Sequence, residues 1–181
     1  TTVDSAFLDS PKVELPEEIK QVTINQKFMV FVPNSLIWHY HYKNRLTKVS
    51  VTQFYKQIVF LIRKLYPELN IVMLPQTFNF GTFLGDDIHF FKNLASEIND
   101  SHIIILKDKY SSDIQQTIIS HAEFLIGARY HSIVFALNNN IPFVALSYEH
   151  KISGLLETLK KGELLILQDC QMDIIVIKLI M

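Results

Sequence analysis

Cysteine is almost absent from this sequence, which has a single one, Cys170, among 181 residues. One cysteine excludes an intrachain disulfide and any zinc site that is built from several thiolates. We therefore expect a chain that works in a reducing compartment, the cytoplasm.

Glycine is also scarce. The chain has five glycines, and no two of them have the spacing of a dinucleotide-binding or Walker phosphate loop. A GxSxG nucleophile elbow is missing too. We therefore do not expect a nucleotide that is bound through a glycine-rich loop.

An excess of charge of one sign is the third absence. The chain has 17 basic and 18 acidic residues, with a formal net charge of -1. It therefore has no overall field that would attract nucleic acid, and an anionic ligand would need a local cationic pocket.

The apolar runs are shorter than the roughly 18 to 20 residues that span a bilayer, so no transmembrane segment is expected. The first residues lack the basic and apolar regions of a signal peptide.

What the chain does contain, from residue 27 onward, is an alternation of short apolar runs with longer segments of helical period. This pattern predicts an α/β fold, a Rossmann-like parallel sheet with helices on both faces. The runs are continuous rather than alternating, as in strands that are covered on both sides. The predicted strands are 27–33, 69–74, 102–106, 123–127, 142–146 and 163–167.

Caps and spacing predict the helices between these strands. We expect a helix over 50–66 with Ser50 as the N-cap, and one over 86–98 that begins with two acids at the positive end of the helix dipole. A third helix should start at Ser111 or Ser112, and a fourth should run from after Gly127 to the asparagines at 138–140. Pro11 and Pro16 indicate a linker rather than an element. We therefore divide the chain into an inter-domain segment, 1–26, and a Rossmann-like domain, 27–181. The apolar last residues, "MDIIVIKLIM", favour a cut inside a longer chain over a final helix that docks on the sheet.

Arg129 and His131 lie between two apolar runs, in "LIGARYHSIVFALNNNIPFVAL" at 125–146. Ligands of an open parallel sheet bind beyond the carboxyl ends of its strands, and Gly127 ends such a strand. Arginine suits a phosphate or carboxylate, and histidine moves a proton near neutral pH. Residues two apart on a helix diverge by about 200°, so the pair converges only if Arg129 is in the loop or first turn. The alternative is an ordinary polar helix start.

Other candidates follow other strands at the same edge. The segment 147–154 offers Tyr148 and Lys151, although a solvated helix start would look the same. Gln76, after the second strand, can donate to a ligand or cap the turn.

The loop after the first strand, within 32–46, carries Trp38 and Arg45 and suits an aromatic acceptor loop. His39 and His41 resemble metal ligands, but no carboxylate or cysteine stands near them. We expect no metal.

Residues 119–156 resemble the C-terminal half of the polysaccharide pyruvyl transferase family. The family pattern has an acidic residue, a strand-ending glycine, an arginine-x-histidine-serine helix start, an alanine-leucine helix end, a proline, and a tyrosine with a lysine three residues on. The matching positions are Glu123, Gly127, Arg129, His131, Ser132, Ala136, Leu137, Pro142, Tyr148 and Lys151. The opening "TTVDSAFLDS" and "MLPQ" at 73–76 also look similar to the family.

One departure from the family lies after the first strand. Many members carry an arginine there, where this chain has "VPNS". Asn34 therefore stands in that place, or Arg45 substitutes for the missing arginine.

The resemblance implies a GT-B-type architecture with two Rossmann-like halves. Residues 27–181 would then be the C-terminal domain of a two-domain transferase whose N-terminal domain is missing here. Family members transfer the pyruvyl group of phosphoenolpyruvate onto a sugar to form a ketal, commonly in exopolysaccharide or cell-wall polymer synthesis. The implied location is the cytoplasm or the inner face of the membrane.

The resemblance also assigns roles to residues. It implies phosphoenolpyruvate as co-substrate, no cofactor and no metal, with His131 and Arg129 as catalytic residues. The implied donor-binding residues are Arg129, Ser132, Lys151, Tyr148, Gln76 and Asn34, with Trp38 and Arg45 on the acceptor side.

Two rival functions remain open. One is a GT-B-like glycosyltransferase that uses a nucleotide-sugar donor at the same edge of the sheet. The other is a non-catalytic module that binds glycans or assembles with a partner.

Overall fold

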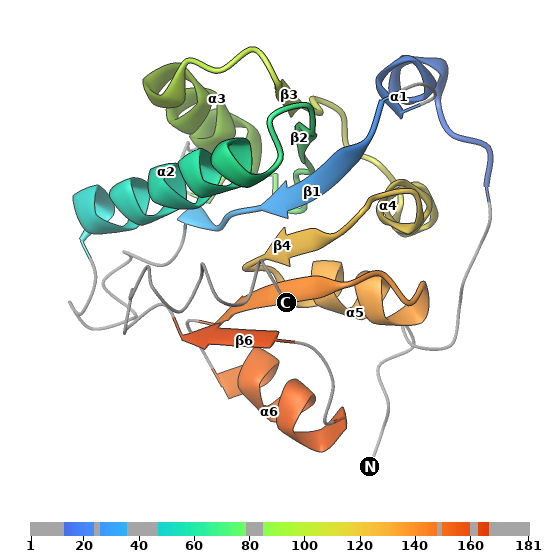
Figure 1. The fold of residues 1–181 in the computed structure, drawn as a ribbon. Helices are drawn as coiled ribbons and strands as arrows, with labels where there is room; N and C mark the ends of the chain where they lie inside the picture. The colour runs from blue at the N-terminus through green and yellow to red at the C-terminus, as the bar shows by residue number, and fades with distance from the viewer. Residues whose placement is uncertain are drawn as a thin grey trace.

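A computed structural model describes residues 13–23, 26–35, 47–78, 85–147, 150–159 and 163–166 of the chain (Figure 1). Six parallel strands form one sheet in the order β3-β2-β1-β4-β5-β6. The strands are β1 Phe28–Val32, β2 Asn70–Met73, β3 Ile103–Ile105, β4 Leu125–Gly127, β5 Phe143–Ser147 and β6 Glu163–Ile166. The helices are α1 Glu17–Thr23, α2 Lys48–Leu65, α3 Asp87–Ile98, α4 Ser112–Ser120, α5 Tyr130–Asn138 and α6 His150–Leu159. The predicted Rossmann-like α/β fold is confirmed.

Two apolar layers cover the sheet. Buried side chains of α2 and α3 join one hydrophobic cluster, and those of α1, α4, α5 and α6 join the other. The helices themselves lie on the two sides of the sheet (Figure 1). The strands alternate between the layers: Met29 and Phe31 of β1 join the first cluster, while Val30 and Val32 join the second. Burial on both faces explains why the strand sequences are continuous apolar runs.

The strand order reverses beside β1, which has β2 on one side and β4 on the other. At the carboxyl edge Val32 lies opposite Gly127, and the Ala128 amide donates to the Val32 carbonyl at 2.8 Å. In open parallel sheets the crevice at such a switch point is the usual ligand site. The described residues that directly follow β1, β2 and β4 lie at this edge.

The helix after β4 ends as its asparagines predict. Asn140 has a φ of 53°, in the left-handed region. The amides of Asn140 and Ile141 donate to the carbonyls of Leu137 at 3.2 Å and Ala136 at 2.9 Å. These bonds form a Schellman motif, which satisfies the last carbonyls of α5 and turns the chain toward β5.

Two predictions about helix starts need correction. The linker prediction from Pro11 and Pro16 is wrong for residues 17–23, which form α1. The Pro16 carbonyl accepts from the amides of Ile19 and Lys20, and Ile19 is buried against the sheet. The N-cap of α2 is Thr47 rather than the expected Ser50.

The two hydroxyl residues at the start of α2 bond reciprocally. The Ser50 amide donates to Thr47 Oγ1 at 3.1 Å, and the Thr47 amide donates to Ser50 Oγ at 3.0 Å. Ser50 is therefore the third residue of α2 and completes a capping box with Thr47, which is the cap. Ser111, by contrast, is the N-cap of α4, as expected.

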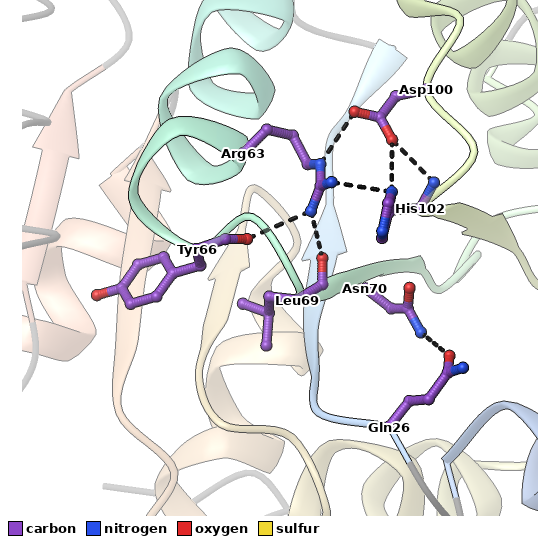
Figure 2. Close-up of polar contacts among 7 residues, drawn as sticks. All are labelled: Gln26, Arg63, Tyr66, Leu69, Asn70, Asp100 and His102. Carbon is purple, nitrogen blue, oxygen red and sulfur yellow. Dashed lines mark hydrogen bonds and ion pairs between the residues drawn. The ribbon is translucent and has the colours of Figure 1, made fainter.

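A polar cluster fixes the opposite, amino edge of the sheet (Figure 2). Arg63, near the end of α2, donates from Nε to Asp100 Oδ2 at 2.9 Å and from Nη1 to the Leu69 carbonyl at 3.0 Å. Its Nη2 lies 2.9 Å from His102 Nδ1, which accepts because a guanidinium can only donate. One side chain thus joins the end of α2 to the starts of β2 and β3.

No helix in the described ranges is both long and apolar enough to cross a lipid bilayer.

Candidate active site

The start of α5 carries the arginine-x-histidine-serine segment. Arg129 occupies the N-cap position with extended backbone, φ −109° and ψ 133°, and its side chain makes no capping bond. Ser132 is fully buried, and its hydroxyl donates to the Arg129 carbonyl at 2.7 Å. This bond closes the first turn, so the backbone at Arg129 is held in place.

Gly127 allows this packing of the helix start on the strand. A Cβ atom at position 127 would lie 2.5 Å from Ser132 Oγ, closer than ordinary contact. The absence of a side chain at this position therefore lets α5 approach the end of β4.

The Arg129 side chain turns toward the start of α3. Its Nη2 donates to Asp87 Oδ1 in an ion pair, with 11% of the arginine side chain and none of the aspartate side chain exposed. Asp87 Oδ2 accepts from the amides of Gln76 at 3.0 Å and Thr77 at 2.9 Å. One carboxylate therefore connects the loop after β2 with the loop after β4, across the end of β1.

The environment of Asp87 is dominated by burial. Burial raises the pKa of this carboxyl, and the Arg129 guanidinium together with the two loop amides only partly opposes the increase. Removing a carboxylate from water disfavours its charged form, whereas a nearby cation favours it. The ion pair therefore compensates two groups that would each be costly to bury alone.

Three buried polar atoms have no hydrogen-bond partner within the described residues: Ser35 Oγ, Gln76 Oε1 and Arg129 Nε. They follow β1, β2 and β4, which are neighbouring strands. Buried polar atoms are nearly always satisfied in proteins, so unpaired ones require an explanation. A ligand or water bound at this edge would supply the missing hydrogen-bond partners.

The orientation of the Gln76 amide follows from its neighbours. Gln115 Nε2 donates to the Tyr110 carbonyl at 2.9 Å, which leaves Gln115 Oε1 to accept from Gln76 Nε2 at 3.0 Å. The Gln76 oxygen is then the atom that remains unpaired. An amide oxygen only accepts hydrogen bonds, so a ligand group that binds it must be a donor and not an anion.

His131 lies on the exposed side of the first turn of α5. Its ring contacts those of Tyr130 and Phe135, with centroids 5.7 Å and 6.2 Å away. The Arg129 guanidinium itself bonds to Asp87. The structure thus places Arg129 at the start of α5, the position that convergence with His131 requires.

The other predicted site residues are more dispersed. Asn34 is fully buried at the end of β1, where its amide donates to Tyr55 Oη at 3.1 Å. Lys151 is exposed in the first turn of α6. Tyr148, Trp38 and Arg45 lie outside the described residues, as do His39 and His41. The described residues contain no group of three or more histidine, cysteine or acidic side chains that could hold a metal.

Asp87 is the residue that sequence reasoning missed. In the sequence it is one of two acids at a helix start, a position for which the helix dipole is a sufficient explanation. Asp87 follows β2 and therefore lies at the same edge of the sheet as Arg129, which follows β4. Only the strand order shows that a single strand, β1, separates the ends of β2 and β4.

Comparison with known proteins identifies the family. A family model described as polysaccharide pyruvyl transferase matches residues 1–150. The chain belongs to the polysaccharide pyruvyl transferase family. Asp87, Arg129 and His131 fall inside the matched range, and Lys151 lies just beyond it.

Solved structures share the fold of this chain. A protein described as a UDP-N-acetylglucosamine 2-epimerase from Listeria monocytogenes matches with a TM-score of 0.60 and 10% identity, over 96% of this chain and 41% of that one. The E. coli trehalose-6-phosphate structure bound with UDP-2-fluoro glucose matches with a TM-score of 0.57 and 12% identity, over 91% and 39%. These likenesses place the fold with one half of a GT-B-type enzyme. The chain spans about two fifths of the length of these proteins.

Proposed function

We propose that this chain is the donor-binding part of an enzyme that transfers the pyruvyl group of phosphoenolpyruvate to a sugar of a polysaccharide or of its lipid-linked precursor. The observation that carries the proposal is the Arg129 guanidinium, which lies nearly buried at the switch point of the sheet with its Nε unpaired among the described residues. The family match supports the transferase class.

The chemistry of the donor fits this guanidinium. Phosphoenolpyruvate carries a phosphate and a carboxylate, and arginine binds either through parallel N–H donors. Only Nη2 of Arg129 is used by Asp87, so Nε remains available to an anion. The first amides of α5 point toward the same edge and add the partial positive charge of a helix N-terminus.

His131 is the proposed acid. It protonates the methylene carbon of phosphoenolpyruvate, which leaves an oxocarbenium-like centre at the neighbouring carbon. A sugar hydroxyl attacks that carbon and loses its proton. A second hydroxyl closes the ketal, the bond to the phosphate oxygen breaks, and inorganic phosphate leaves with the remaining proton. Exposure of His131 on α5 leaves its ring accessible to the donor.

The rest of the donor and acceptor sites is part of the same proposal. Lys151 and Tyr148 would add donors from the segment after β5, and Gln76, Asn34 and Ser132 would complete the pocket. The acceptor sugar would meet Trp38 and Arg45 and a second domain, since the chain spans about two fifths of the matched proteins. The reaction uses no cofactor or metal, and it takes place in the cytoplasm or at the inner face of the membrane.

Two variants test the assignment in the complete protein. His131→Ala should abolish phosphate release from phosphoenolpyruvate and leave the melting temperature unchanged, because this side chain is exposed. Arg129→Lys keeps the charge but loses the fork, so KM for phosphoenolpyruvate should rise at least tenfold. Near-normal kcat in the first variant, or an unchanged KM in the second, contradicts the assigned role.

Ligand-induced stabilisation separates the rival functions. A ligand at about 100 times its Kd stabilises the folded state by about 2.7 kcal/mol. Phosphoenolpyruvate should therefore raise the melting temperature, whereas UDP-sugars should not. A shift with UDP-sugars alone favours a glycosyltransferase, and a shift with glycans alone, without phosphate release, favours a binding module.

A further inference from the structure

We infer that Asp87 is a positioning residue, which fixes the Arg129 guanidinium so that its remaining donors can bind an anion. The inference rests on the proposed function for the identity of that anion. Its structural basis is independent of the function, because it consists of the contacts of Asp87 itself.

Three donors fix the Asp87 carboxylate. The amides of Gln76 and Thr77 both donate to Oδ2, and Arg129 donates to Oδ1. The main chain holds the same residue, since the Asp87 amide donates to the Thr77 carbonyl at 3.0 Å. A carboxylate that is held by backbone on one side offers a rigid anchor on the other.

Helix capping does not require Asp87. The cap of α3 is the preceding residue, Asp86, whose Oδ1 accepts from the His89 amide at 2.9 Å. Asp87 is instead fully buried, where an ionised carboxylate is costly unless it is paired. The contacts that compensate this cost are the loop amides and Arg129. The contacts of the Asp87 carboxylate therefore join the loop after β2 to the start of α5 after β4.

Positioning matters because arginine is flexible. A free arginine side chain loses much rotamer entropy when it binds a ligand, and a preorganised fork loses less. With Nη2 held by Asp87 and the backbone fixed through Ser132, the guanidinium of Arg129 has its plane and place set before the anion arrives. Its buried Nε is left without a partner in the described residues, ready for an oxygen of the ligand.

The isosteric variant Asp87→Asn breaks this anchor selectively. The asparagine oxygen can still accept from the amides of Gln76 and Thr77, but its NH2 group then faces the donor of Arg129. Two donors repel, so the guanidinium leaves its place. We expect KM for phosphoenolpyruvate to rise at least tenfold, while kcat changes less than threefold. Asp86→Asn is the matched control, because asparagine caps a helix as well as aspartate and KM should stay within twofold.

A double-mutant cycle distinguishes positioning from a general structural role. If Asp87 acts through Arg129, then Asp87→Asn should change KM less than twofold in an Arg129→Lys background. An effect of the same size in both backgrounds overturns the inference. If Asp87→Asn fails to fold, Asp87→Ser replaces it, since a serine hydroxyl still accepts a loop amide and leaves room for water.

A second measurement is independent of turnover. In the complete protein labelled with 15N-arginine, the Nε–H signal of Arg129, assigned through its loss in Arg129→Lys, should be sharp in the wild type and lost or broadened in Asp87→Asn. An unchanged signal in Asp87→Asn overturns the inference. A wild-type protein that neither binds nor turns over phosphoenolpyruvate refutes the proposed function, and titration of this signal with inorganic phosphate then decides whether the fixed guanidinium binds an anion at all.

Discussion

Substituting Gly127 with alanine is predicted to destabilise the junction of β4 and α5. An added Cβ would lie 2.5 Å from Ser132 Oγ, 3.0 Å from Leu125 Cδ2 and 3.3 Å from Ile133 Cδ1. The serine cannot move away easily, because it is fully buried and donates to the Arg129 carbonyl. Alanine at position 127 is therefore unfavourable because its Cβ would crowd the fixed Ser132 side chain.

The magnitude follows from overpacking in a buried site, which costs about 1 to 3 kcal/mol. Alanine lowers the entropy of the unfolded chain and offsets about 0.5 kcal/mol of this cost. We expect a net loss of about 1.5 kcal/mol in the free energy of unfolding for Gly127→Ala. For a chain of this size such a loss lowers the melting temperature by about 3 to 6 °C.

Gly154 provides the matched control. It lies on the exposed side of α6, and a Cβ there would have no atom within 4 Å. Gly154→Ala should therefore stabilise the protein by about 0.5 to 1 kcal/mol, because alanine favours the helix more than glycine does. Urea denaturation of both variants measures the two changes, which should have opposite signs.

Ser132→Ala tests the cause of the destabilisation. If the clash with the hydroxyl is responsible, Gly127→Ala should cost at least 1 kcal/mol less in the Ser132→Ala background by rough estimate. Equal costs in both backgrounds, or a Gly127→Ala variant as stable as the wild type, would refute the reasoning.

Two further predictions concern the amino edge of the sheet (Figure 2). Arg63→Met should lower the free energy of unfolding by about 3 kcal/mol in urea denaturation, because it removes several bonds of a mostly buried side chain, whereas the exposed neighbour Lys64→Met should change it by less than about 0.5 kcal/mol. Burial tends to raise the pKa of Asp100, but the His102 amide and the Arg63 guanidinium outweigh it and hold the pKa below its ordinary value of 3.8. The stabilisation by this carboxylate should therefore be present above pH 3.8 and lost as the pH falls below it, and acid unfolding curves of wild type and Arg63→Met that run parallel below that pH would contradict the assignment.

The strands could be predicted because their sequences are unambiguous. A run such as "FMVFV" in β1 is apolar at every position, and the structure buries both of its faces. The prediction of Ser50 as the cap of α2 was wrong, because Thr47 three residues earlier also carries a hydroxyl that can cap a helix. The structure uses both, and only the backbone conformation at Thr47 shows which one is the cap.

Helix α1 was missed because Pro16 was interpreted as a breaker. Proline interrupts a helix from inside but is well tolerated at its beginning, where no amide partner is needed. The buried Ile19 was the available signal, although a helix of 7 residues gives little periodicity to detect.

The candidate site was predicted in part. A strand-ending glycine followed by an arginine places Arg129 at the carboxyl edge, and the structure has it there. The direction of its side chain was not predictable, because Asp87 is 42 residues away in the sequence and meets it only through the strand order. The roles of Arg129 and His131 remain predictions.

The Asp87 carboxylate contacts the loop after β2 through main-chain amides. Peptide N–H groups are present whatever side chain a residue carries, so mutation at position 77 to most amino acids leaves that contact intact. Proline is the exception, because it has no amide hydrogen. A substitution of Thr77 by a residue other than proline therefore leaves this backbone attachment available.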